Sequence, residues 1–290
     1  MRAPTLWLNA HDAAHMVGHL GESAAIYDVT DDWSQVSQPS ARRRRTIRED
    51  KRLCQRADAV IVCSEALRQS KTALCRHIYL VPNGVDAPHY AVASSHAKPP
   101  GTTLWSGTVL GYTGTLHGDR LDVELVRRLA GILGNTGSVV LIGPDHLSGS
   151  ERERLRLPNV FLVGVVPYTR LPDYMHYFDA CIVPHKVTPF TESLNPIKLW
   201  EYLALGKPII ATRIAGFRDY PGLVYLADGA EEFAGWARLA VGEDPRLPRE
   251  RRAEAEAHSW ENRCDAVEEV IFGCRIRRAQ AEGAFKNTNA

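Results

Sequence analysis

Short apolar runs alternate with amphipathic stretches along almost the whole chain. Runs of this length are typical of buried strands, and the longer amphipathic stretches between them are typical of helices. Strands and helices that alternate in this way predict an α/β fold with parallel sheets. The expected strands are Thr5–Leu8, Ala24–Val29, Ala59–Cys63 and Ile78–Val81, then Val109–Tyr112, Ser138–Ile142, Val160–Val163, Ala180–Val183, Ile209–Ala211 and Leu223–Leu226.

The alternation is interrupted once, which divides the strands into two series. The segment over residues 87–107 reads APHYAVASSHAKPPGTTLWSG, and its Pro, Ser and Ala content predicts a linker. We therefore expect a first domain over residues 1–86 and a second over residues 108–257. The polar stretch over residues 279–290 is expected to be a flexible tail.

A helix in the second series has clear end signals and one unusual residue. In the run NPIKLWEYLALGKPIIAT, Asn195 suits the N-cap and Pro196 suits the first helical position. Lys198 falls in the first turn, where a cation opposes the helix dipole unless an anion is bound there. Glu201 follows about one turn later and could face the same site. The alternative is a surface ion pair between Lys198 and Glu201.

Acidic residues follow the strand at Ala24–Val29, in the sequence YDVTDDWS. Asp31 and Asp32 therefore lie at the carboxyl end of that strand, where open α/β sheets bind ligands. Carboxylates at this edge could bind a metal, supply a general base, or cap the next helix.

The composition argues against nucleic-acid binding and a membrane span, and it includes one basic run. The 290 residues carry a formal net charge of +1, so no overall field attracts nucleic acid. No stretch approaches the roughly 18 apolar residues that span a bilayer, and the N-terminus is a poor signal peptide. The six cysteines include no C-x-x-C pair, which is typical of the reducing cytosol. The basic run Arg42–Arg45 is either a solvated helix face or a surface for anionic lipid.

Several of these segments together resemble one known family. The ungapped run NPIKLWEYLALGKPIIAT is similar to the signature of group 1 (family 4-like) glycosyltransferases, in the form found in bacterial cell-surface polysaccharide enzymes. The resemblance covers about residues 20–275 and includes YDVTDDW, ADAVIVCSEALRQS, IYLVPNGVD, NVFLVGVVPYTRLPDY and HSW. It implies a GT-B-like fold with two Rossmann-like domains, of which the first is incomplete, and a helix over residues 258–278 that crosses back between them.

The resemblance implies a site for a nucleotide-sugar donor in the second domain. The N-terminus of the Lys198 helix would face the diphosphate, and Glu201 would accept hydrogen bonds from the ribose hydroxyls. The turn at Gly114 would lie over the diphosphate, although a glycine in a strand–helix turn is also common without any ligand. Thr115 stands where many members carry an arginine.

Further donor contacts are implied around this turn and in two other segments. Arg120 is the better candidate for the cation on the diphosphate, with His117 and Lys186 as helpers; a solvated loop histidine is the alternative for His117. The main chain at Gly164, Val165 and Val166 would contact the nucleobase. Glu192 is one position out of register with the family's first glutamate, so backbone N–H groups over residues Ser193–Asn195, rather than Glu192, would serve the sugar or phosphate.

The resemblance also implies the reaction and its partners. A sugar would pass from a UDP- or GDP-linked donor to a hydroxyl of a glycan or lipid-linked acceptor, with Asp31 or Asp32 as general base. The nucleotide sugar is a substrate, and we expect no cofactor and no metal, because the sequence has no clear D-x-D motif. The expected location is the cytoplasm, with Arg42–Arg45 as one route to peripheral contact at the inner face of the membrane.

The short first series of strands leaves other functions open. The resemblance leads us to expect an N-terminally truncated first domain, whether through a misassigned start codon, a separately encoded half or a decayed gene. One alternative is therefore a nucleotide-sugar-binding fragment or partner subunit without turnover. A second alternative is a nucleotide-sugar epimerase of the GT-B fold.

Overall fold

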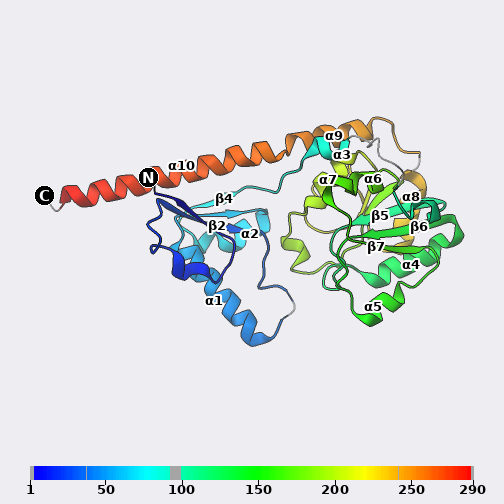
Figure 1. Ribbon diagram of the computed structural model, residues 1–290, viewed down its shortest axis with the longest axis horizontal. Helices are drawn as coiled ribbons and strands as arrows, with labels where there is room; N and C mark the ends of the chain where they lie inside the picture. The colour runs from blue at the N-terminus through cyan, green and yellow to red at the C-terminus, as the bar shows by residue number, and fades with distance from the viewer. Residues whose placement is uncertain (1–2, 37, 92–98, 241, 289–290) are drawn as a thin grey trace. The chain divides into compact units, whose positions relative to one another are not determined.

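The computed structural model describes residues 3–36, 38–91, 99–240 and 242–288 (Figure 1). Its chain separates into a first compact unit, residues 1–83, 192–195 and 260–290, and a second, residues 84–191 and 196–259. Each unit is built on a parallel sheet, so the predicted α/β class with two parallel sheets is confirmed.

The sheet of the first unit has the strand order β1-β2-β3-β4, with strands at Thr5–Leu8, Ala24–Val29, Ala59–Val62 and Ile78–Leu80. Each strand lies beside the one before it in the chain, so right-handed crossovers place the connecting helices on one face. These helices are α1 (Ser40–Arg56) and α2 (Glu65–Lys71). The opposite face is covered by α10 (Trp260–Thr288), whose Val270 and Cys274 pack on the sheet (Figure 1).

The sheet of the second unit has the order β10-β9-β8-β5-β6-β7. The strands are β5 (Thr108–Thr113), β6 (Gly137–Ile142), β7 (Val160–Gly164), β8 (Ala180–Val183), β9 (Ile209–Thr212) and β10 (Tyr225–Ala227). From β5 the chain adds β6 and β7 on one side of the sheet, and it then adds β8, β9 and β10 on the other side of β5. In doubly wound sheets, ligands bind at the carboxyl ends of the two strands where the direction reverses. That position lies between β5 and β8.

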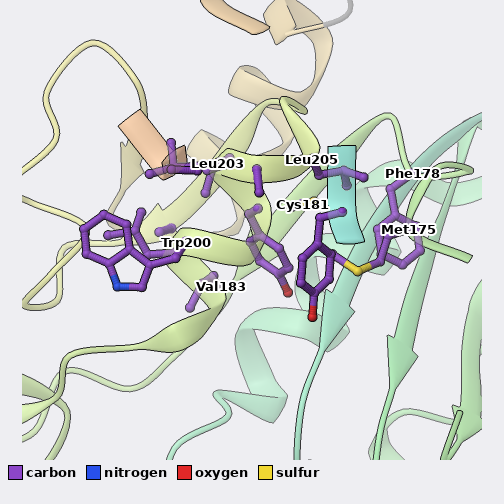
Figure 2. Close-up of a cluster of buried hydrophobic side chains, with 14 of the residues drawn as sticks. Met175, Phe178, Cys181, Val183, Trp200, Leu203 and Leu205 are labelled. Atoms are coloured by element: carbon purple, nitrogen blue, oxygen red, sulfur yellow. The ribbon is translucent and has the colours of Figure 1, made fainter. Parts of the chain in front are cut away.

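Helices cover both faces of this sheet. One face carries α4 (Val123–Leu133), α5 (Gly149–Arg154) and α8 (Ala230–Ala240). The other carries α3 (Ala87–Ala91), α6 (Leu171–Met175), α7 (Ile197–Leu205) and α9 (Leu247–Ala257). Figure 2 shows the core beneath α7, where Trp200, Leu203 and Leu205 gather with Met175, Phe178, Cys181 and Val183.

A buried ion pair fixes α9 to the loop that precedes it. The Arg251 side chain is fully buried and donates to both carboxylate oxygens of Glu243, at 2.5 and 2.8 Å. The Arg251 Nε atom also donates to the Leu223 carbonyl at 2.9 Å. The guanidinium therefore has its charge and three of its donors satisfied inside the protein.

The predicted elements differ from the structure in a few places. Residues 87–91, which we expected in a linker, form α3; residues 92–98 of that stretch lie outside the described residues. Strand β10 begins at Tyr225, two residues later than predicted. The C-terminal helix continues to Thr288 through the expected tail. The buried Tyr90 explains the first difference, because packing of this one aromatic side chain orders a segment of otherwise linker-like composition.

The start of α7 is also displaced. Asn195 does not cap the helix, and Pro196, with a ψ of 118°, is still extended, so the helix begins at Ile197. The Asn195 side chain instead accepts a hydrogen bond from the Asn83 amide at 2.9 Å. The end of the helix is as predicted, because Gly206 closes it in the left-handed region with a φ of 77°.

Candidate functional site

Glycines follow three neighbouring strands at the carboxyl edge of the second sheet. Gly114, Gly143 and Gly164 follow or end β5, β6 and β7, and all have positive φ angles, of 133°, 144° and 83°. A Cβ atom on Gly143 would lie 2.3 Å from the Gly114 carbonyl oxygen, so these backbones touch. At this edge Gly143 is buried, while Gly114 and Gly164 are partly exposed and carry no side chain that would keep a ligand from the main chain. Gly143 was not among the predicted residues, although the Gly143-Pro144 turn after a predicted strand was a usable signal.

Lys198 lies directly against the first of these glycines. Its ammonium is 5.2 Å from the centre of the Tyr112 ring, and a Cβ on Gly114 would lie 2.5 Å from its Nζ atom. The alternative of an ion pair with Glu201 is not observed among the described residues. Lys198 lies in the first turn of α7, which has no side-chain cap and in which the Leu199 amide donates to the Pro196 carbonyl at 3.0 Å. This combination is suited to an anion.

Glu201 lies one turn further along α7, and its carboxylate is held by a residue that sequence reasoning missed. The Tyr90 hydroxyl, from α3, donates to Glu201 Oε1 at 2.8 Å. Burial raises the pKa of Glu201, while the Tyr90 hydrogen bond and the charges of Lys198 and His89 oppose that rise. No other described residue donates a hydrogen bond to this carboxylate, so it retains acceptor capacity for a ligand.

The buried His185 also belongs to this site, because it contacts Tyr112. His185 follows β8 at the reversal point, and its Nε2 atom lies 3.1 Å from the Tyr112 hydroxyl. Burial, together with the charges of Lys198 and Arg120, holds the pKa of His185 well below its usual value, so the ring is neutral. Its Nδ1 atom is buried and has no hydrogen-bond partner in the described part of the chain. His185 was also missed by the sequence reasoning.

The other predicted cations surround the turn after Gly114. Arg120 lies over the Phe190 ring at 5.1 Å, and its carbonyl accepts from the Lys186 amide at 2.7 Å. The Lys186 ammonium donates to the Gly118 carbonyl at 2.5 Å, so it braces the turn from within. His117 is exposed and faces Asp119 at 3.6 Å, and Thr115 is exposed beside it.

The segment predicted to contact a nucleobase ends in an exposed surface. Val165 is 72% exposed, whereas Val166 packs partly against the core. Tyr168 follows and stacks on His89 with ring centres 4.2 Å apart. The Gly164 carbonyl accepts a hydrogen bond from the Gly143 amide at 2.8 Å, so this end of β7 is tied to the neighbouring strand end, and the exposed Val165 follows it.

Two predicted residues make their contacts in the first unit. The Ser193 carbonyl accepts a hydrogen bond from the Ser64 hydroxyl at 2.6 Å. The Asn195 carbonyl accepts from the Asn83 side chain at 2.6 Å. The structure thus assigns Ser193 and Asn195 to a different unit from Lys198 and Glu201.

The predicted carboxylates lie at the end of β2, around a small hollow. Asp31 and Asp32 line it together with Tyr27, Asp50 and Lys71, among others. Asp32 Oδ1 accepts from the Ser34 amide at 3.1 Å and from the Ser34 hydroxyl at 2.5 Å. Asp32 therefore caps a local turn and not α1, which begins only at Ser40.

None of the helices in the ranges given above is both long and apolar enough to cross a bilayer. The same residues contain no group of three or more His, Cys, Asp or Glu side chains arranged to hold a metal ion.

The second unit is similar in sequence to a known family and to a named relative. Residues 107–238 match the family described as glycosyl transferases group 1. A Bacillus subtilis (strain 168) protein named as a teichuronic acid biosynthesis glycosyltransferase, TuaH, is 31% identical over 204 residues, which are 65% of this chain. The chain spans about half, 50%, of the length of that relative.

Solved structures show the same fold over nearly the whole chain. HepE from Anabaena, in complex with UDP, is 16% identical, with 93% of this chain and 79% of HepE covered and a TM-score of 0.72. Sucrose-phosphate synthase from Thermosynechococcus elongatus is 20% identical, with 93% and 73% covered and a TM-score of 0.72. At these identities the likeness establishes the GT-B fold.

Proposed function

We propose that this chain, whose residues 107–238 match the group 1 glycosyltransferase family, transfers a sugar from a nucleotide diphosphate sugar to a hydroxyl group of a polysaccharide acceptor. Its fold is GT-B. The observation that carries the proposal is the Lys198 ammonium against Gly114, in the first turn of α7, which no side chain caps, at the reversal point of the sheet.

The chemistry explains why a cation belongs at this place. In the transfer, an acceptor oxygen forms a bond to C1 of the donor sugar, and the bond from C1 to the diphosphate oxygen breaks. Negative charge develops on the leaving diphosphate, so preorganised donors aimed at it lower the barrier. We assign this role to Lys198, to the main chain at Gly114 and Thr115, and to Arg120 at the end of the same turn.

The nucleoside half of the donor would lie further along the same edge. Glu201, held by Tyr90, would accept hydrogen bonds from the two ribose hydroxyls, and the main chain of Gly164 and Val165 would meet the base. UDP is the nucleotide that HepE binds, and HepE has also been solved with UDP-glucose. We therefore propose a UDP-linked donor, with GDP as the nucleotide to test against it.

The acceptor side is assigned to the first unit. We propose that Asp31 or Asp32 accepts the proton of the attacking hydroxyl. The relative TuaH is named for teichuronic acid biosynthesis, which supports a polysaccharide acceptor. The cysteine spacing supports a reaction in the reducing cytosol.

The direct test measures nucleotide release and sugar transfer with a panel of UDP- and GDP-sugars. We expect release of UDP from one donor of the panel, coupled to attachment of its sugar to a glycan acceptor. Lys198→Ala should slow release by tenfold or more, whereas Lys207→Ala, a lysine beyond the far end of the same helix, should not. Donor binding without release would indicate a binding subunit, and isomerisation of the bound sugar without transfer would indicate an epimerase.

A further inference from the structure

A second cavity lies in the first unit, next to the hollow that Asp31 and Asp32 line. Its volume is about 390 Å³, within the range of about 300–1,000 Å³ for small-molecule sites. The two hollows share His11, Trp33 and Thr46 in their walls. The cavity therefore adjoins the small hollow lined by the carboxylates proposed to act on the acceptor.

The cationic wall of this cavity comes from part of the basic run on α1. Arg42 and Arg45 line the cavity, because residues three apart share a face of a helix. Arg43 instead donates to the Ser34 carbonyl at 2.9 Å, and Arg44 is exposed outside the cavity wall. Within the described ranges, no hydrogen bond or ion pair occupies the Arg42 or Arg45 guanidinium. A pair of free guanidiniums matches the two oxygens of a carboxylate or phosphate.

The remaining walls suit the ring and the hydroxyl groups of a sugar. Trp33 is 43% exposed and presents a flat apolar surface. The Gln38 side-chain amide donates to the Trp33 carbonyl at 2.8 Å. This bond holds the Gln38 side chain in place and leaves its amide oxygen as an acceptor. Asp12 and His11 also line the cavity and can bond to hydroxyl groups. Asp12 further disfavours an anionic group anywhere but at the arginine wall.

We propose that this cavity binds an anionic sugar residue of the acceptor glycan. Its carboxylate or phosphate would lie on Arg42 and Arg45, and its ring would lie against Trp33. A neighbouring free hydroxyl of the same glycan would then lie on the side of the cavity nearest to Asp31 and Asp32. The identification of the ligand as the acceptor rests on the proposed function, but binding of an anionic sugar does not.

The test compares three soluble probes by isothermal titration calorimetry: methyl β-D-glucuronide, glucose 6-phosphate and neutral methyl β-D-glucoside. We expect at least one anionic probe to bind tenfold or more tightly than the glucoside, and the tighter one identifies the anion. The double variant Arg42→Gln/Arg45→Gln should remove that preference. Arg44→Gln, which removes one positive charge from the same run outside the cavity, should change the affinity less than twofold.

Three results would overturn the inference. The first is equal affinity for charged and neutral probes, and the second is an equal loss in Arg44→Gln and in the Arg42 and Arg45 variants. The third is binding to vesicles of phosphatidylglycerol without binding of either anionic sugar, which would make the run a membrane surface. A parallel titration of the wild-type protein with UDP separates the two proposals: UDP bound without sugar contradicts this inference alone, and sugar bound without UDP contradicts the proposed function alone.

Discussion

A side chain at Gly114 is unfavourable for two separate reasons. Its φ angle of 133° is strained for any L-residue, and an added Cβ would overlap the Lys198 ammonium at 2.5 Å. We predict that Gly114→Ala destabilises the second unit by about 1–3 kcal/mol through strain and weakens UDP binding at least tenfold through displacement of Lys198. Urea unfolding and calorimetric titration measure the two effects.

Gly131→Ala is the matched control for this substitution. Gly131 lies inside α4 with nothing near its added Cβ, so alanine should stabilise the helix by roughly 0.5–1 kcal/mol and leave UDP binding unchanged. UDP affinity that survives in Gly114→Ala would mean that the ammonium does not act at this place.

The pKa of Glu201 gives a prediction about pH. Burial raises this pKa above the ordinary glutamate value of 4.5, so the proton is held more strongly in the folded protein. The contribution of Glu201 to stability therefore falls as the pH rises through the folded pKa. Ribose binding needs the ionised carboxylate, so affinity should fall as the pH drops through a value above 4.5. Uridine is the probe, because it carries the ribose without a phosphate that titrates near pH 6.

Two glutamine variants separate this effect from general acid destabilisation. Glu201→Gln should weaken uridine binding at neutral pH and abolish the acidic dependence. Glu256→Gln, at an exposed position on α9, should retain both. A wild-type affinity that is flat between pH 4.5 and 7.5 would be incompatible with the ribose role of Glu201.

At the scale of single residues, the sequence predicts chemistry better than contacts. Lys198 and Gly114 could each be selected from local pattern, because a cation in a first helical turn and a glycine after a strand are both unusual or demanding positions. Tyr90 could not be selected from local pattern, because its partner Glu201 is distant in the chain and the segment around Tyr90 has linker composition. His185 depends on burial by the whole sheet edge, which no local pattern contains.

At the scale of elements, strands were predicted closely and short helices were not. Strands such as β2 and β8 are buried along most or all of their length, so their apolar runs mark both ends. Helix α3 spans only residues 87–91, too short to show a helical period, and packing alone specifies it. The start of α7 shifted by one residue because Asn195 bonds to Asn83 instead of capping the helix.

The Arg251–Glu243 ion pair leads to a prediction about the stability that it gives to α9. Arg251→Ala should destabilise the second unit by about 3–5 kcal/mol, because it leaves the Glu243 carboxylate, whose side chain is 8% exposed, without its cation. Thermal or urea unfolding measures the loss. Arg249→Ala, exposed on the same helix, should change stability by about 0.5 kcal/mol or less.

A double variant tests the reason for that loss. Replacing both partners, as Glu243→Gln with Arg251→Met, should cost less than Arg251→Ala alone, because no unpaired charge remains. A larger loss in the double variant would show that packing, rather than the buried charge, holds α9 in place.

At the scale of the whole molecule, the position of the site follows from the order of the strands. The α/β class and the resemblance to group 1 glycosyltransferases could be obtained from sequence, and the matched family and the solved folds confirm them. The order of the strands in the sheet could not be obtained from sequence, because parallel pairing joins segments far apart in the chain. That order places β5 beside β8 and so makes one site of Gly114, His185 and Lys198.

The central claim is that this edge of the second sheet binds the diphosphate of a nucleotide sugar, and UDP titration by calorimetry tests it most directly. The wild-type protein should bind UDP, and Lys198→Ala should weaken binding roughly tenfold to a hundredfold, as loss of a hydrogen bond to a charged group does. Lys207→Ala removes the same charge about 13 Å away, beyond the other end of α7, and should have less than a threefold effect. Absence of UDP binding by the wild-type protein, or equal losses in the two variants, would contradict the claim.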